Sequence, residues 1–243
     1  MLRNFGSIRR WVLVSLTTAL LPVCAAAASG PELTAGAADP LKLYGPTIEF
    51  DVFRKGEWVG FHRVRFERSG EDLVVSNMFE VEIRVLVFTA FRYVYQSESR
   101  WRRGQLVGLI ASVSDNGKSL LTEAMLEDGR MMVKNADGGI AVDGTLFPTN
   151  HWNVAVLRET RVLNTLTGRI NSIRIEPRGR EDVPTEWGDV SATRYVYTGD
   201  LGAEVWYDDA GRWVKLRFKG RDGTAIEYVC RRCQGPEVKQ AKR

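Results

Sequence analysis

Histidine and cysteine are the scarcest chemically active residues of this chain. Its 243 residues include two histidines, His62 and His151, and three cysteines. Two imidazoles cannot form a multi-histidine zinc site in a single chain, and neither histidine stands at a recognised metal-ligand spacing from a cysteine. We therefore expect no metal and no cofactor.

His151 is the candidate catalytic residue, because it lies in a loop-like stretch beside Trp152. The alternative is a loop histidine that hydrogen-bonds to the backbone. A hydrolase would also need a nucleophile, and Gly-x-Ser-x-Gly, the motif of a nucleophile elbow, is absent. A hydrolase that uses His151 stays as an alternative to a protein that is not an enzyme.

Cys230 and Cys233 form a Cys-Arg-Arg-Cys motif. Three residues of ideal strand separate two Cα atoms by roughly 10 Å, whereas a disulfide needs less than about 7 Å. A bond between them therefore requires Arg231 and Arg232 to turn. In an oxidising compartment we expect this bond to form and to be structural. The alternative is a thiol-disulfide protein, although such motifs usually stand at the start of a helix.

The first 28 residues have the pattern of a secretory signal. Three arginines precede the uncharged apolar run from Trp11 to Val23, and Ala25 to Ala28 supplies small residues for cleavage. The sequence predicts a signal peptide over residues 1–28, cleaved near Ala28, and hence a periplasmic protein with no transmembrane segment after cleavage.

Two other interpretations of this N-terminus fit the sequence less well. A membrane anchor is disfavoured because the apolar run is shorter than the roughly 20 residues that a spanning helix needs. Lipidation at Cys24 is disfavoured because Val23, which precedes it, is not the small residue that a lipobox requires.

The charge balance argues against a nucleic-acid partner. The chain has 34 basic and 30 acidic residues, and removal of the three signal arginines leaves 34 − 3 = 31 basic residues, so the mature chain is close to neutral. Residues 29–46 are aperiodic and predict a flexible leader. Residues 234–243 predict a disordered basic tail.

From residue 47 onward apolar and polar residues alternate with a period of two, which is typical of strands. Turn signals recur roughly every 8 to 12 residues, and Asn116-Gly117 is the clearest hairpin turn. The sequence predicts a single all-β domain over residues 47–233. We expect a curled antiparallel up-and-down sheet of about a dozen strands, an open barrel or β-spiral.

The stretch from Phe147 to Leu166 interrupts this alternation. Its apolar residues fall mostly at helical spacing, and Thr149 or Asn150 could cap a short helix. We predict a short helix and loop that plugs or covers the sheet, with Trp152 facing the interior.

A dense aromatic face in the strand Phe91 to Trp101 lies before this stretch. Such residues commonly pack a core, but a curled sheet of this size could also hold an apolar ligand on its concave face. The predicted ligand-binding residues are Phe147, His151, Trp152, Tyr93, Tyr95 and Trp101.

Five segments resemble an uncharacterised family of exported proteobacterial proteins, over roughly residues 45 to 230. They are Trp58 to Phe66, Glu98 to Trp101, Pro148 to Asn153, Thr165 to Arg169, and Val205 to Asp208 with Gly211. That family looks akin to periplasmic open-barrel or β-spiral envelope proteins and, more distantly, to lipoprotein carriers. The resemblance implies a curled antiparallel sheet and a role in the cell envelope, and it supplies no catalytic residues.

The sequence thus favours a monomeric, non-enzymatic periplasmic protein that binds a lipid-like molecule or an envelope partner on a curled sheet. The alternatives are a periplasmic enzyme, either the hydrolase or the thiol-disulfide protein, and a structural envelope factor with no pocket.

Overall fold

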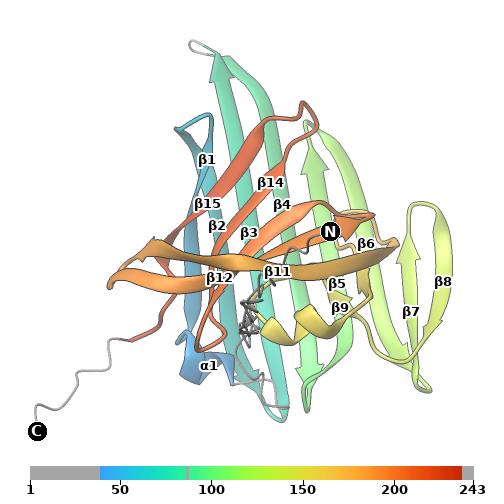
Figure 1. Cartoon of the computed structure of the whole chain (residues 1–243). Helices are drawn as coiled ribbons and strands as arrows, with labels where there is room; N and C mark the ends of the chain where they lie inside the picture. Colours follow the sequence, from blue (N-terminus) through green and yellow to red (C-terminus); the bar gives the residue numbers. More distant parts are fainter. Residues whose placement is uncertain (1–38, 86–87, 237–243) are drawn as a thin grey trace, which may run out of the picture.

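The computed structural model describes residues 39–85 and 88–236, which form one curled sheet with two short helices (Figure 1). The expected signal peptide, residues 29–38 of the expected leader and residues 237–243 of the expected tail lie outside the described residues. Within the described part, no helix has the length and apolar character needed to cross a membrane.

The described chain contains a four-residue α-helix, α1 (Pro40–Leu43), a 3-10 helix, η1 (Val154–Arg158), and fifteen strands. The strands are β1 (Thr47–Arg54), β2 (Glu57–Ser69), β3 (Asp72–Val85), β4 (Phe88–Arg102), β5 (Gln105–Asp115), β6 (Lys118–Glu127), β7 (Arg130–Asn135), β8 (Gly138–Asp143), β9 (Phe147–Pro148), β10 (Arg161–Leu163), β11 (Ile170–Thr185), β12 (Gly188–Gly199), β13 (Ala203–Asp208), β14 (Trp213–Lys219) and β15 (Ala225–Arg232).

The sheet consists of two meanders, which are joined because the first strand of the chain, β1, pairs with the last, β15. Its order is β8-β7-β6-β5-β4-β3-β2-β1-β15-β14-β13-β12-β11-β10-β9, so that β1 pairs with β15 in the middle and β8 and β9 form the two edges. This confirms the all-β fold and the curled, unclosed sheet. The strands exceed the expected dozen partly because β9 and β10 lie within the stretch that was expected to be loop and helix.

Strand formation follows the alternation of the sequence. In β2, His62, Val64 and Phe66 are buried, whereas Arg63 and Arg65 point away from the core. The turn between β5 and β6 has positive φ at both central residues, 49° at Asn116 and 88° at Gly117, as a type I′ hairpin requires.

The two edges of the sheet are linked by side chains near the turn that precedes β11. The Asn135 side chain donates a hydrogen bond of 2.9 Å to the Gly168 carbonyl, and Arg169 pairs with Asp137 at 2.7 Å. The edges therefore meet through polar contacts between turns, and not through a ladder of backbone hydrogen bonds.

The folded domain begins earlier than the expected boundary at residue 47. The Asp39 side chain caps α1 by accepting a hydrogen bond from the Leu41 N–H, and Tyr44 is fully buried in the core. At the other end, Gln234 is buried and the Gly235 carbonyl accepts a hydrogen bond from Trp187, so both belong to the domain and not to the expected tail.

Gly60 in β2 is expected to tolerate no side chain. A Cβ atom there would lie 1.8 Å from the Glu80 carbonyl oxygen of β3, so the paired strands would have to move apart. We expect Gly60→Ala to lower the free energy of unfolding by about 3 kcal/mol or more, measured by urea denaturation. The matched control is Gly108→Ala in β5, where the nearest atom lies 3.9 Å away. Equal stability of the two variants would contradict this strand packing.

Candidate functional site

The stretch Phe147 to Leu166 enters the sheet as β9, turns, forms η1 and returns as β10, which pairs in parallel with β9. The expected helix is therefore a single short 3-10 helix. Its cap is Asn153, whose side chain accepts a hydrogen bond from the Ala155 N–H, and not Thr149 or Asn150. The β-branched Val162 favours an extended conformation, which explains why the second half of the stretch is a strand.

Trp152 is the centre of this plug, which we define as residues 147–166. Only 3% of its surface is exposed, and its ring meets the rings of Phe66 and Trp101 edge to face at 5.4 Å and 5.2 Å. The side chain thus faces the interior of the sheet, as the sequence predicted.

Tyrosine hydroxyls hold the plug to the sheet. Tyr44 donates a hydrogen bond of 2.9 Å to the Trp152 carbonyl and accepts one of 2.8 Å from the Trp213 N–H in β14. Tyr207 donates to the His151 carbonyl at 2.8 Å. These bonds therefore fix the main chain of the plug at His151 and Trp152, the two residues that the sequence had singled out.

Tyr44→Phe is expected to lower the free energy of unfolding by about 2–4 kcal/mol. The substitution leaves the buried Trp152 carbonyl and Trp213 N–H without the hydroxyl that satisfies both, and each lost partner costs roughly 1–3 kcal/mol. Chemical denaturation measures the change. Tyr93→Phe is the control, because the Tyr93 hydroxyl makes no hydrogen bond among the described residues; an equal loss in both variants would refute the bridging role of Tyr44.

His62 lies on the buried face of β2 and is enclosed by aromatic rings. The rings of Phe79, Trp213 and Tyr228 lie 5.9, 5.5 and 5.4 Å away. Burial lowers the pKa of His62 to about 4, although the neighbouring Asn77 opposes this effect. Neither ring nitrogen makes a hydrogen bond of normal geometry, so this is a buried, neutral histidine with unused polar atoms.

His151 is partly buried and also contacts Trp213, with its ring 5.5 Å from the Trp213 ring and 5.5 Å from the Tyr197 ring. Burial, and then the charge of His62, lower the pKa of His151 to about 3. Its Nδ1 atom has no partner among the described residues, so no carboxylate in this part of the chain orients the ring through Nδ1, as one does in a catalytic triad. The alternative interpretation of His151 was a loop histidine that hydrogen-bonds to the backbone. Its Nδ1 atom makes no such bond.

The structure divides the other predicted ligand residues into two groups. Trp101 packs against Phe147 at 5.6 Å and against Trp152, and the Tyr95 hydroxyl reaches Asn150 of the plug at 3.3 Å. Tyr93 is separate from these residues and packs edge to face on Phe79, beside His62. Burial raises the pKa of Tyr93 to about 12.

Several buried polar atoms of the interior lack a partner. Those on the plug are Asn150 Nδ2, His151 Nδ1, Trp152 Nε1 and Asn153 Nδ2, and both ring nitrogens of His62 also lack a partner. Buried polar groups in proteins are nearly always hydrogen-bonded, and each exception needs an explanation. Aromatic walls with a few convergent polar atoms are the usual composition of a small-molecule site.

Two surface hollows in the described part of the chain lie outside this interior group. One, of about 280 Å³, lies along β6 and β7 between Ser119 and Ala136. The other, of about 90 Å³, lies between Glu49, Trp58 and Arg231 and touches His62 from the outer side. Trp152 lines neither of these two hollows.

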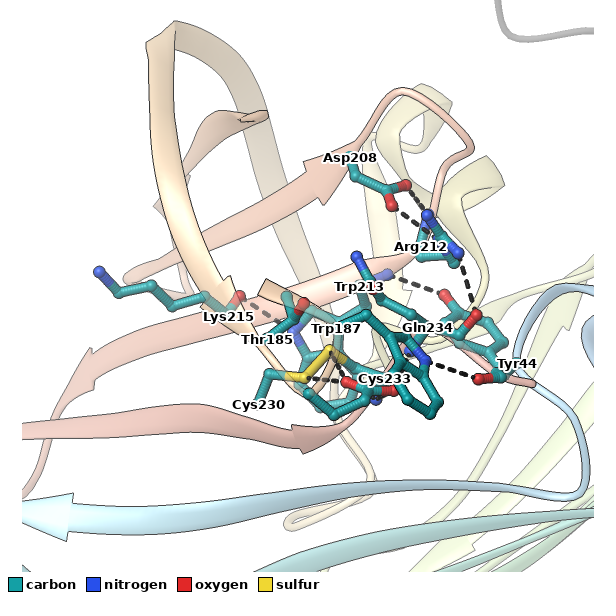
Figure 2. The surroundings of a disulfide bond; sticks show 12 residues. Tyr44, Thr185, Trp187, Asp208, Arg212, Trp213, Lys215, Cys230, Cys233 and Gln234 are labelled. Carbon is teal, nitrogen blue, oxygen red and sulfur yellow. Dashed lines mark hydrogen bonds and ion pairs between the residues drawn. A yellow bond between two sulfur atoms is a disulfide. The ribbon is translucent and has the colours of Figure 1, made fainter. Parts of the chain in front are cut away.

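The cysteines form a second polar group at the end of β15 (Figure 2). Cys230 and Cys233 are bonded, with their Cα atoms 5.8 Å apart. The turn that the sequence required is a β-bulge at Arg231. Glu49 of β1 pairs with Arg232 and the next residue, Phe50, pairs with Cys230, so Arg231 has no partner in β1. Sequence reasoning missed Glu186, whose carboxylate lies 3.0 Å from Cys230 Sγ, because 44 residues separate them in the chain.

Comparisons with known proteins identify the fold and no activity. A family model described as "Domain of unknown function (DUF6134)" matches residues 50–231. A crystal structure of a beta-barrel-like protein of the domain of unknown function DUF1849, from Brucella abortus, superimposes with a TM-score of 0.57 at 13% sequence identity, covering 79% of this chain and 98% of that one. No curated protein matches the chain.

Proposed function

Since the chain belongs to the DUF6134 family of domains of unknown function, we propose from the site itself that it is an exported, non-enzymatic envelope protein that binds a lipid-like molecule. The ligand occupies the concave, aromatic interior of the curled sheet next to the plug. Export and a periplasmic location rest on the signal pattern of residues 1–28.

The unpartnered polar atoms around the plug are the observation that carries this proposal. His62, Asn150 and Trp152 are each more than nine-tenths buried, and each has at least one nitrogen without a partner. An unsatisfied buried donor or acceptor costs about 1–3 kcal/mol. A ligand with one polar head group and an apolar body would satisfy such atoms while its body packs on the aromatic rings.

The plug gives a ligand a route to this space. Residues 147–166 include the edge strand β9, which lies across the opening of the sheet from the other edge, β8, and in the described part of the chain polar contacts between turns link the two edges. Movement of this stretch opens the interior without breaking a pair of long strands. A hydrolase at His151 receives no such support, because among the described residues no carboxylate hydrogen-bonds to the Nδ1 atom of that ring.

Titration with a fluorescent long-chain fatty acid tests the proposal. We expect saturable binding by the wild-type protein and about tenfold weaker binding by His62→Phe, because the loss of one hydrogen bond in the site corresponds to about that factor. Phenylalanine keeps the packing against Phe79 and Tyr228 and removes both ring nitrogens, so the fold is expected to be retained.

The matched control is Trp58→Phe, at an exposed aromatic residue on the outer face of β2. It is expected to bind the fatty acid as the wild type does. The absence of saturable binding by the wild type, or unchanged affinity in His62→Phe, would overturn the interior site.

A further inference from the structure

The hairpin of β11 and β12 ends against the disulfide. Its turn, Thr185 to Gly188, places the Glu186 carboxylate where it accepts hydrogen bonds from the N–H groups of Cys233, at 2.9 and 3.0 Å, and Gln234, at 2.8 Å. Trp187 adds a hydrogen bond from its indole to the Gly235 carbonyl. Figure 2 shows Thr185 and Trp187, which flank Glu186 in the chain, in the surroundings of the disulfide.

The same carboxylate faces both sulfur atoms. Glu186 Oε2 lies 3.0 Å from Cys230 Sγ and 3.7 Å from Cys233 Sγ. Disulfide sulfurs carry no hydrogen, so the oxidised protein gains no hydrogen bond from this approach. The Cys233 N–H donates to both carboxylate oxygens and the Gln234 N–H donates to Oε1, so these backbone groups hold Glu186 at the disulfide with Oε2 as the oxygen that contacts both sulfurs.

We propose that Glu186, Cys230 and Cys233 form a site for a divalent cation of the Zn²⁺ type when the disulfide is reduced. The ligand atoms of the three residues lie within 4.8 Å of one another, and Cys-x-x-Cys is the usual spacing of paired zinc thiolates. The inference is independent of lipid binding, because the site lies at the end of β15 and not on the plug.

The chemistry balances in two steps. A dithiol reductant transfers two electrons and two protons to the disulfide, becomes a disulfide itself and leaves Cys230 and Cys233 as thiols. The cation then displaces both thiol protons and binds two thiolates and the Glu186 carboxylate. Two thiolates and a carboxylate offset the charge of a divalent cation, and the fourth position is open to water at the partly exposed Glu186.

The backbone allows this change of state. Tetrahedral zinc holds two sulfurs about 3.8 Å apart, compared with about 2.05 Å in a disulfide, a separation that side-chain rotation can supply. The two cysteines are only three positions apart in the chain. Because a short loop gains little from cross-linking, loss of the disulfide is expected to lower the free energy of unfolding by only about 2 kcal/mol. The reduced protein therefore remains folded.

Two backbone N–H groups already orient the carboxylate for this task. The Gln234 N–H holds Oε1 and the Cys233 N–H is shared between Oε1 and Oε2, which fixes the carboxylate with Oε2 directed at the sulfurs. Hydrogen bonds of this kind fix the orientation of carboxylates that bind metals. Arg212 fixes the next peptide in turn, by donating to the Gln234 carbonyl at 2.9 Å.

Anaerobic titration with Co²⁺, a spectroscopic substitute for Zn²⁺, tests the site on the full chain. The reduced protein is expected to bind one Co²⁺ with thiolate-to-cobalt charge-transfer bands and the visible bands of four-coordinate cobalt, and Zn²⁺ is expected to abolish both. The oxidised protein is expected to show neither. This comparison uses wild-type protein alone, so it does not depend on the folding of any variant.

Substitutions then identify the ligands. Glu186→Gln is expected to weaken Co²⁺ binding by at least about tenfold. Removal of a residue that only hydrogen-bonds to a metal ligand already has an effect of about that size, and Glu186 is proposed as a ligand itself. Cys230→Ser is expected to weaken it further and to reduce the charge-transfer intensity. Asp189→Asn, on the same hairpin, is the control and is expected to leave affinity unchanged. No cobalt bands in the reduced wild type, or equal affinity of folded Glu186→Gln and wild type, would overturn the proposal.

Discussion

Replacing Trp152 by alanine is expected to lower the free energy of unfolding by about 3–5 kcal/mol, the range for removal of a large buried aromatic side chain. The indole is almost fully buried and packs edge to face on Phe66 of β2 and Trp101 of β4. Its loss leaves a cavity between two strands and the plug. Urea denaturation followed by far-UV circular dichroism measures the change.

Trp58→Ala is the matched control, because Trp58 is 59% exposed and its indole donates one hydrogen bond, to Asp51. It is expected to change the free energy of unfolding by less than about 1 kcal/mol. If Trp152→Ala is no more destabilising than Trp58→Ala, the plug does not complete the core.

Acidification is expected to destabilise the protein by several kcal/mol between about pH 6.5 and pH 4. The folded-state pKa values of His62 and His151 are lowered to about 4 and about 3, below the ordinary value of 6.5. Above pH 6.5 both imidazoles are neutral in the folded and unfolded states. As the pH falls, the unfolded chain binds protons that the folded chain cannot, and each unit of pKa difference contributes about 1.4 kcal/mol.

Denaturation midpoints measured at intervals between pH 8 and pH 4.5 test this expectation. In this range the carboxylates paired with arginine, such as Asp72 and Asp222, contribute little, because their lowered pKa values place their titration at lower pH. The double variant His62→Phe, His151→Phe is expected to show a much flatter profile. A slope that is the same in both proteins would show that the two histidines are not buried in the neutral form.

Much of the fold follows from the alternation of the sequence, because a strand with one buried face must repeat every two residues. The turn at Asn116-Gly117 and the inward side of β2 from His62 to Phe66 were predictable for this reason, whereas Trp58 of the same strand is exposed because the register with β1 shifts there. The pairing of β1 with β15 was not, since no local pattern indicates that strands from opposite ends of the chain lie side by side in the middle of the sheet.

The errors at the domain boundaries also have a physical cause. Tyr44 stands in an aperiodic stretch, and its burial depends on partners at Trp152 and Trp213 that are more than 100 residues away. The plug was recognised because its pattern departs from that of a strand, but its helical spacing indicated more helix than forms. Trp152, the residue expected to face inward, does so because its neighbours Phe66 and Trp101 surround it.

The candidate site was predictable in part. An aromatic interior with His151 and Trp152 on the plug followed from composition and position. The isolation of Tyr93 from the plug, and the enclosure of both histidines around Trp213, depend on the curl of the sheet. Glu186 could not be singled out, because a lone glutamate in a hairpin turn is ordinarily solvated and only the long reach of β11 and β12 brings it to Cys230 and Cys233.

Native mass spectrometry of the protein, purified gently from the cells that produce it, tests the interior ligand site most directly. We expect a species heavier than the processed chain by the mass of a single lipid-like molecule, and we expect organic extraction to remove that mass and His62→Phe to reduce its occupancy. A wild-type protein that carries only the mass of the bare chain, and that takes up no lipid from added vesicles, would contradict the proposed function.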